Sequence, residues 1–393
     1  MARDWLAEKL PAHLEDVRDA ISDVLQQFSR EYWIEVEDSG RYPQDFVDVL
    51  QEGGWLSMLI PSEYGGGGAS LPEAAIVLEA INRWGGAGTL VHAQLYTMGS
   101  VLRFGTEEQK QTWLPQIADG TVRLQSMGVT EPDAGTDTTR IRTFAERRGD
   151  HYVVNGGKIW TSRVLQSDLL LLLCRTERYE DVEKKTDGIT VLLVDLREAV
   201  PSGQIEVSPI KVMSGHHTNQ LFIRDLVVPV ENRIGDEGKG FRVILSGLNA
   251  ERILAASQYI GSGLWFVERS VEYAKEREGF GRPIGMNQGI QFPIAQAFAN
   301  IRAASAIRWQ AATLFAEGNE GGTEANIAKL LSSQALWQAA NATMDTFGGA
   351  GLASEYGVEQ KFRQARGPMI APISTNLVLA GIAHRDLGMP KSF

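Results

Sequence analysis

The chain has 393 residues, with 43% hydrophobic and 22% charged side chains, which is typical of a soluble globular protein. This length exceeds what one hydrophobic core usually supports, so two or three domains are expected. The formal net charge of −11 argues against a nucleic-acid partner or an anionic membrane surface, because either would repel the chain. The charge does not exclude an anionic ligand held by a few local arginines.

The single cysteine, Cys174, ends an apolar run at residues 169–173 and is expected to be a buried strand residue. One cysteine excludes an intrachain disulfide and a site built from several cysteines, and it favours a reducing, cytoplasmic setting. The first residues lack the positive-then-apolar pattern of a secretory signal. No apolar run approaches the roughly 18 residues of a membrane span, so a cytoplasmic protein without membrane insertion is expected.

Residues 1–120 are predicted to form a helical domain. Between residues 6 and 28, apolar side chains recur every three or four positions. A second helix should begin after Pro43 and stop at residues 53–54, and Thr106 is a typical cap for a third, which Pro115 should close. Residues 60–68, with four consecutive glycines, are compatible with a plain flexible linker.

Residues 121–235 change to a period of two, with turn signals every ten or so residues. The strand-like segments are 151–154, 169–173, 189–194 and 221–223. They predict a mostly antiparallel β-domain, either a sandwich or a barrel. The polar stretch 177–187 should be a solvated loop.

Residues 236–393 are predicted to be helical again. One long apolar stripe runs from residue 240 to about 278 and is broken at 283–285, and alanine-rich helices follow at 289–317 and 323–347. Helices of this kind pack into a four-helix bundle. The expected fold is therefore α+β, with an N-terminal helical domain (1–120), a central antiparallel β-sandwich or barrel (121–235) and a C-terminal bundle (236–393).

Residues 127–163 contain two polar, glycine-bearing segments, TEPDAGTD at 130–137 and NGGKIWTS at 155–162. In the first, Pro132 stiffens the chain and Gly135 allows a ligand to approach the backbone closely. In the second, Trp160 stands beside two hydroxyl side chains. An aromatic wall with convergent hydroxyls suits a flat ring that forms hydrogen bonds. The alternative is two ordinary hairpin turns, at 130–137 and 155–157.

Together these segments resemble the middle domain of the acyl-CoA dehydrogenase family of flavoproteins. The resemblance extends to an I-P-x-x-Y-G-G-x-G loop at 60–68, an R-x-x-F-G motif at 277–281 and an F-G-G-x-G loop at 347–351. It covers nearly the whole chain, including the α–β–α order. It implies an FAD-dependent acyl-CoA dehydrogenase that desaturates an acyl-CoA thioester. A carboxylate would take the α-proton while the β-hydrogen leaves as hydride to flavin N5, and an electron-transfer flavoprotein would then take the electrons.

The resemblance also implies which residues hold FAD. Arg277 would contact the cofactor's pyrophosphate, whose geometry suits a guanidinium group. The glycine loop at 348–349 would approach the FAD of a neighbouring subunit, which implies a homodimer or homotetramer. Asp345 departs from the glutamine that the family usually carries before this loop. The full set of matching positions is Met127, Val129, Thr130, Trp160, Ser162, Arg277, Phe280, Gln288, Gly348, Gly349, Ser374 and Asn376.

The catalytic base is the most informative position. Many family members carry it as a glutamate after an R-x-A-R segment, but here Pro372 stands at that place and cannot take a proton. A second subgroup keeps its base on the long helix after the β-domain, in a pattern like L-x-x-E-R, which matches Glu251 and Arg252. The resemblance therefore implies Glu251 as base, with Arg252 and Thr136 near the substrate. Elsewhere, a Glu-Arg pair on a helix is usually a solvated ion pair.

Two alternatives remain open at this stage. A flavin oxidase or monooxygenase would keep the same fold, and a non-catalytic flavin-binding subunit would have lost its base. Pro372 favours the second alternative and Glu251 argues against it. His216 and His217 are a candidate metal pair, but the sequence shows no third ligand, so a solvent or substrate-rim loop is expected and no metal is predicted.

Overall fold

The computed structural model describes residues 10–215, 217–319 and 321–391. The chain forms two compact units. The helical unit contains residues up to 46, residues 70–89 and residues from 249 onward, and the sheet unit contains residues 47–69 and 90–248. The expected division at 120 and 235 remains a prediction. No helix in the described part of the chain is both long and apolar enough to cross a membrane.

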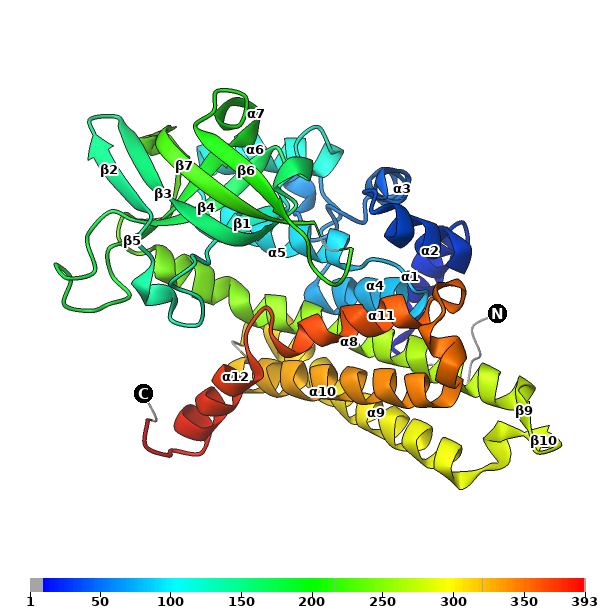
Figure 1. Ribbon diagram of the computed structural model, residues 1–393. Coiled ribbons are helices and arrows are strands. Elements are labelled where there is room, and N and C mark those ends of the chain that lie inside the picture. The colour runs from blue at the N-terminus through cyan, green and yellow to red at the C-terminus, as the bar shows by residue number, and fades with distance from the viewer. Residues whose placement is uncertain (1–9, 216, 320, 392–393) are drawn as a thin grey trace. The chain divides into compact units, whose positions relative to one another are not determined.

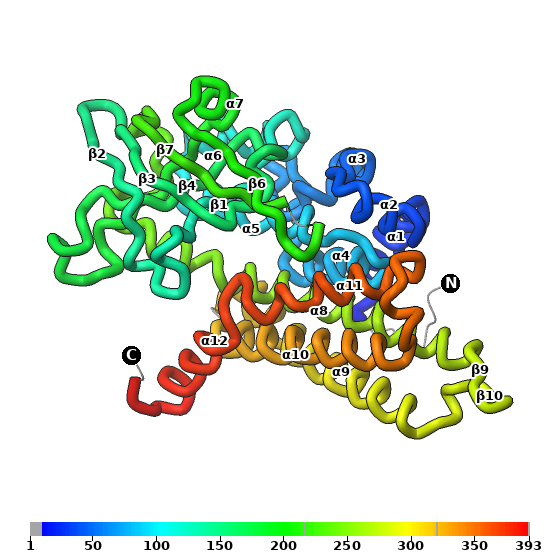
Figure 2. Tube along the Cα trace, in the orientation of Figure 1, coloured from blue at the N-terminus to red at the C-terminus, as the bar shows by residue number. Residues whose placement is uncertain are grey.

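The helical unit is built around three long helices, α8 (Gly240–Glu276, mostly within this unit), α9 (Gln288–Ala316) and α10 (Gly322–Phe347). Figures 1 and 2 show them side by side, and their apolar faces share one core. Alanines at 297, 304, 335, 339 and 340 line that core, so α9 and α10 can approach closely. The shorter helices are α1 (Ala12–Leu25), α2 (Arg30–Ser39), α4 (Leu71–Arg83), α11 (Val358–Arg366) and α12 (Thr375–Gly381).

A short hairpin joins α8 to α9, where the sequence predicts a break. Its strands are β9 (Glu278–Gly279) and β10 (Arg282–Pro283). Tyr273, near the end of α8, stacks on Phe347, the last residue of α10, with ring centroids 4.0 Å apart. The hairpin and the glycine-rich turn η7 (Gly348–Leu352) therefore lie at the same end of the bundle.

The sheet unit contains one eight-stranded sheet with helices α3 (Gln44–Glu52), α5 (Thr89–Phe104), α6 (Glu107–Asp119) and α7 (Leu196–Ala199). The strand order is β6-β7-β3-β2-β4-β5-β8, with β1 paired to β4. The expected α+β fold is confirmed, but the sheet is mixed, because β1 and β2 both pair with β4 in parallel. The strands are β1 (Ser126–Gly128), β2 (Phe144–Arg148), β3 (His151–Ser162), β4 (Leu169–Arg175), β5 (Ile189–Asp195), β6 (Ile205–Ile210), β7 (Thr218–Pro229) and β8 (Arg233–Ile234).

Strand β4 is apolar from Leu169 to Cys174 because both of its faces are covered. Residues 169, 171 and 173 join a core with residues of α5 and α6, whereas 170, 172 and 174 join a second core with β3, β5 and β7. Alternate side chains of a strand point to opposite faces, so a strand buried on both sides reads as a continuous apolar run. Cys174 is fully buried, as expected.

The alternative of a hairpin turn at 155–157 is wrong, because β3 continues through these residues. Strand β3 pairs with β7 on both sides of this point, with a register shift between Val154 and Gly156. Gly156 has φ 149°, and a Cβ there would lie 2.6 Å from the Cα of Thr143. The glycine therefore lets β3 bulge against a close neighbouring backbone instead of turning.

Two predictions about the segments before the sheet also change. Pro115 lies inside α6, which continues to Asp119 and ends at Gly120 with φ 82°, so the glycine and not the proline stops the helix. The four-glycine segment is a packed loop and not a flexible linker. The amides of Gly67, Gly68 and Ala69 donate to backbone carbonyls at residues 57–60, and a Cβ on Gly66 would lie 2.2 Å from one of them.

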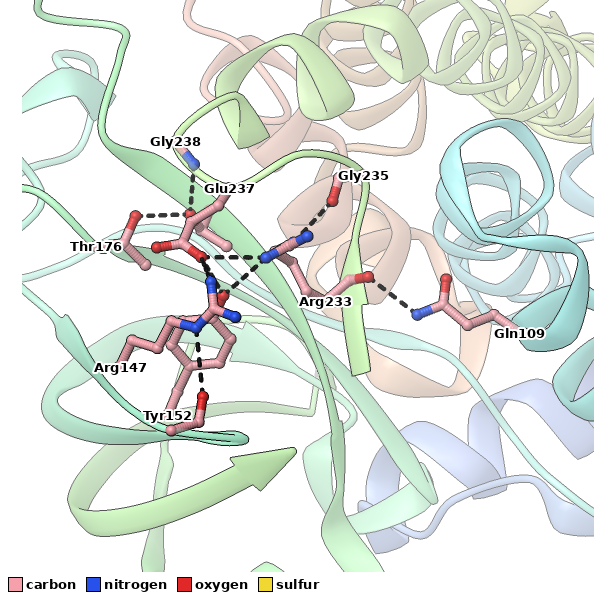
Figure 3. A network of polar contacts seen from close by, with 10 residues as sticks. Gln109, Arg147, Tyr152, Thr176, Arg233, Gly235, Glu237 and Gly238 are labelled. Carbon is pink, nitrogen blue, oxygen red and sulfur yellow. Dashed lines mark hydrogen bonds and ion pairs between the residues drawn. The ribbon is translucent and has the colours of Figure 1, made fainter. Parts of the chain in front are cut away.

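A network of polar contacts fixes the connection from β8 to α8 (Figure 3). The Glu237 carboxylate accepts hydrogen bonds from Tyr152 at 2.7 Å and from Arg147 and Arg233 at 3.1 Å. The amide of Gly238 donates to the Thr190 hydroxyl at 2.9 Å. These contacts anchor the start of the helix that carries Glu251.

Candidate functional site

In the sheet unit, predicted site residues lie on two adjacent segments. Met127 lies in β1, Val129 and Thr130 follow that strand directly, and Trp160 and Ser162 lie near the end of β3. The Ile159 amide donates to the Thr130 carbonyl at 2.9 Å. The segments are joined again by the Ser126 hydroxyl, which donates to the Ser162 carbonyl at 2.8 Å. The sheet thus places these predicted cofactor residues beside one another.

A buried ion pair lies under the same two segments. The Lys158 Nζ donates to the Glu131 Oε1 at 2.7 Å and to the Val129 carbonyl at 3.0 Å. Burial alone would raise the pKa of Glu131, but the Lys158 charge and the hydrogen bonds that the carboxylate accepts hold that pKa below its ordinary value. Burial lowers the pKa of Lys158, and the Glu131 charge opposes that change.

Trp160 adopts a backbone conformation that is unusual for its residue type. Its φ is 61°, within a second irregularity of β3 between Lys158 and Thr161, and its side chain is 54% exposed. A left-handed conformation costs a non-glycine residue about 1–2 kcal/mol. Such strain gathers at functional sites. The structure therefore presents a large indole at the surface of the unit, where a flat ring can stack on it.

Thr136 lies in the exposed loop after β1.

Glu251 and Arg252 lie on α8, just after the point, at Asn249, where this helix enters the helical unit. Burial raises the pKa of Glu251 from 4.5 to about 7, and the Arg252 charge opposes the rise. The Arg252 side chain is buried and donates to the Asn249 side chain at 3.0 Å. At neutral pH both protonation states of Glu251 are accessible, which is the condition for efficient proton transfer.

Two further side chains hold the segment around Pro372. The Tyr259 hydroxyl donates to the Ala371 carbonyl at 3.2 Å, and the Lys329 Nζ donates to the Ile373 carbonyl at 2.7 Å. Burial, and secondarily the Arg252 charge, lower the pKa of Lys329 to about 8. Burial and the Glu251 charge raise the pKa of Tyr259.

Tyr259 and Lys329 are not predicted from the sequence. Tyr259 is two helical turns after Glu251, so it lies on the same face of α8. Lys329 is the single basic residue of the alanine-rich helix α10. These two patterns were the available signals. Ser374 and Asn376 follow the held segment, and the Ser374 hydroxyl accepts from the Leu377 amide at 3.3 Å, which caps α12.

The remaining predicted residues gather at the other end of the bundle. Arg277 and Phe280 belong to the hairpin after α8, and Gln288 begins α9. Phe280 has φ 53° and is fully exposed. A Cβ on Gly348 or Gly349 would meet no atom within 4 Å, so the backbone there is open to a ligand. These five residues share one end of the bundle.

Glu251 does not belong to that end. It precedes Arg277 by 26 residues of almost continuous helix, which corresponds to roughly 39 Å at 1.5 Å per residue. Lys329, near the start of α10, shares the Glu251 end, whereas Phe347, at the end of α10, shares the hairpin end. Figure 1 shows α12 and the β9–β10 hairpin at opposite ends of α10.

Metal ligation finds no support in the described part of the chain, which contains no group of three or more His, Cys, Asp or Glu residues arranged around an ion. His216 lies outside the described residues. In the sheet unit, the exposed indole of Trp160 suits a flat ring. In the helical unit, the exposed Arg277 and the open backbone of Gly348 and Gly349 suit a phosphate group.

Comparison with known proteins decides the family. Three family models match the chain, all described as acyl-CoA dehydrogenase domains: the N-terminal domain at residues 11–121, the middle domain at 126–226 and the C-terminal domain at 238–384. Acyl-CoA dehydrogenase FadE12 of Mycobacterium tuberculosis is 32% identical over 96% of both chains. The chain belongs to the acyl-CoA dehydrogenase family. As expected from the sequence, it is an acyl-CoA dehydrogenase and thus an oxidoreductase.

Two other relatives of this acyl-CoA dehydrogenase bear on its fold and partners. The structure of a glutaryl-coenzyme A dehydrogenase in complex with glutaryl-CoA covers 98% of both chains, with a TM-score of 0.91 and 28% identity. The subunit CarC of the caffeyl-CoA reductase-Etf complex of Acetobacterium woodii is 32% identical over 87% of this chain and 89% of its own. The first confirms the fold, and the second is named as part of an Etf complex.

Proposed function

We propose that this acyl-CoA dehydrogenase desaturates its acyl-CoA thioester with Glu251 as the base. The observation that carries the proposal is the pKa of Glu251, raised to about 7 by burial on a helix where family resemblance locates a base. At the position where many family members carry the base, this chain has Pro372. The described segment 367–376 contains no carboxylate. The resemblance to the helix-base subgroup and the raised pKa of Glu251 therefore support the same residue.

The residues around Glu251 support the proton transfer in distinct ways. The Glu251 carboxylate takes the α-proton, and the charge of Arg252 keeps part of the carboxyl population ionised at neutral pH. Tyr259 and Lys329 hold residues 371–373 in place. FAD, when bound, supplies the hydride acceptor for the β-hydrogen. We assign Thr136 and Arg252 to contacts with the acyl-CoA.

FAD would be held by the residues that match the family pattern. Trp160 would cover the flavin ring, with Met127, Val129, Thr130 and Ser162 beside it. Arg277 would pair with the pyrophosphate. The other proposed contacts are Phe280, Gln288, Gly348, Gly349, Ser374 and Asn376.

The proposed enzyme is a homodimer or homotetramer. Arg277, Gln288 and the glycine loop lie at the opposite end of the bundle from Glu251, roughly 39 Å away along α8. One cofactor cannot contact both ends of the same chain through these residues. We therefore assign the hairpin end to the active site of a second copy.

The proposed electron acceptor is an electron-transfer flavoprotein. The relative CarC, named as a subunit of a caffeyl-CoA reductase-Etf complex, supports this acceptor. We also propose a cytoplasmic location, because the sequence carries a single cysteine, Cys174.

Anaerobic titration of the purified protein with a panel of acyl-CoAs tests the reaction. We expect at least one thioester to bleach the flavin absorbance, and the reduced enzyme to be reoxidised quickly by an electron-transfer flavoprotein and slowly by air. Fast reoxidation by air would favour an oxidase or monooxygenase instead. No bleaching by any thioester would favour a non-catalytic flavin-binding subunit.

A further inference from the structure

The ion pair between Lys158 and Glu131 lies next to the predicted flavin residues Val129, Thr130 and Trp160. Lys158 precedes Trp160 by two residues on β3, and Glu131 directly follows Thr130. The Lys158 ammonium bonds the Val129 carbonyl as well as the carboxylate. Together with the bond from the Ile159 amide to Thr130, three consecutive residues, 129–131, are bonded to two consecutive residues, 158–159.

Glu131 also fixes the chain beyond the loop. Its two carboxylate oxygens accept from the backbone amides of Arg142 at 2.6 Å and Thr143 at 2.9 Å. The side chain of Lys158 is 0% exposed and that of Glu131 is 8% exposed. Bonds of this length to ionised groups are strong and geometrically specific. The pair therefore holds the start and the end of the loop at 131–142.

Stability alone does not explain a buried pair at this place. Removing two charges from water costs about as much as their attraction returns, so apolar residues of similar size often serve as well. A bond from the ammonium to Val129 has a different effect, because it determines where a backbone carbonyl of the cofactor segment points. Trp160, in its left-handed conformation, lies two residues away on the bulged strand.

We propose that Lys158 and Glu131 are positioning residues that set segment 129–131 and Trp160 in place for the flavin before the cofactor binds. The inference rests on the proposed function, because it takes FAD as the ligand of this segment. Neither side chain touches the reacting atoms in this scheme. Their effect reaches the cofactor through the Val129 and Thr130 backbone.

A charge-balanced double variant, Lys158→Met with Glu131→Gln, separates positioning from stability. It leaves no unpaired buried charge. The single amide oxygen introduced at position 131 can replace only one of the two bonds that Glu131 accepts from the Arg142 and Thr143 amides, and the bonds from Lys158 to Val129 and Glu131 are lost. We expect FAD affinity to fall about ten- to hundredfold, the equivalent of one lost hydrogen bond to a charged group. We also expect a changed visible spectrum of the bound flavin.

The helical unit offers a matched control. Arg308 is 0% exposed and bonds Glu79 at 2.6 Å, so Arg308→Met with Glu79→Gln removes a buried pair of similar geometry. We expect this control to change the unfolding temperature by a similar amount while FAD affinity and the flavin spectrum stay at wild-type values. If the two double variants lose FAD equally, or neither loses it, the pair is structural and the inference is overturned.

FAD binding by the wild-type protein tests the proposed function itself, and a wild-type protein that binds no FAD would overturn that function. Amide hydrogen exchange of the wild-type protein freed of FAD tests the positioning role separately. We expect the amides of Arg142, Thr143 and Ile159 to be protected without the cofactor. Protection that appears only after FAD is added would contradict positioning in advance.

Discussion

The buried Glu251 is the proposed base, and its burial also lowers the stability of the folded protein when the carboxylate is ionised. Its pKa rises from 4.5 to about 7 because burial disfavours the charged form. The folded protein therefore binds a proton more tightly than the unfolded chain does between these values. Stability linked to Glu251 falls as pH rises from about 4.5 to 7, and then stays constant. The full shift corresponds to about 3 kcal/mol, an upper figure because the side chain is partly exposed.

Substituting Glu251→Gln should therefore stabilise the protein at high pH. We expect the variant to unfold at a higher temperature than wild type at pH 8, with a much smaller difference at pH 5, where Glu251 is protonated in the folded state. Thermal unfolding of both proteins at the two pH values measures this. An equal or lower unfolding temperature for the variant at pH 8 would show that the charge of Glu251 is not buried.

At the residue scale, the sequence predicts those site residues that belong to contiguous motifs. Glu251 and Trp160 stand in such motifs. Tyr259 and Lys329 do not, because each acts on a backbone carbonyl more than forty residues away in sequence. The same holds for Lys158 and Glu131, whose contact across 27 residues requires the register of β3 against the segment after β1. Tertiary contacts of this kind have no local signal.

At the scale of elements, the long helices follow directly from their apolar periodicity, whereas the strand β3 does not. Its Asn155-Gly156-Gly157 sequence is a strong turn signal, but pairing with β7 on both sides continues the strand. The close Thr143 backbone explains why a glycine is needed inside a strand. Pro115 similarly interrupts one hydrogen bond of α6 without ending the helix.

The Glu237 network should contribute more to stability than an exposed ion pair of the same sheet. Glu237→Gln weakens charge-assisted bonds from Arg147 and Arg233, so we expect a loss of about 1–2 kcal/mol in the free energy of unfolding. Glu146→Gln, which weakens the exposed pair with Arg148, should cost less than about 0.5 kcal/mol. Denaturant unfolding of both variants compares them, and equal losses would remove any special role for the network.

At the scale of the whole molecule, the separation of Glu251 from Arg277 makes a prediction about assembly. We expect Glu251→Gln and Arg277→Ala to be inactive as separate homo-oligomers. In a dimeric unit made of one chain of each, one site receives both altered residues and the other receives neither. Such hybrids should therefore recover activity at one of every two sites.

Hybrids purified through two different affinity tags allow this measurement, with flavin bleaching by substrate as the readout. An inactive hybrid would mean that Glu251 and Arg277 serve the same site within one chain. Roughly half of wild-type bleaching would support the shared arrangement.

Anaerobic bleaching of the Glu251→Gln variant tests whether Glu251 removes the α-proton. Glu272→Gln serves as control, because Glu272 lies on the same helix and pairs with Arg269 at 2.9 Å. We predict that both variants retain bound FAD, that the control bleaches with an acyl-CoA substrate at the wild-type rate, and that Glu251→Gln does not bleach. Bleaching of Glu251→Gln at the rate of the control would contradict the assignment.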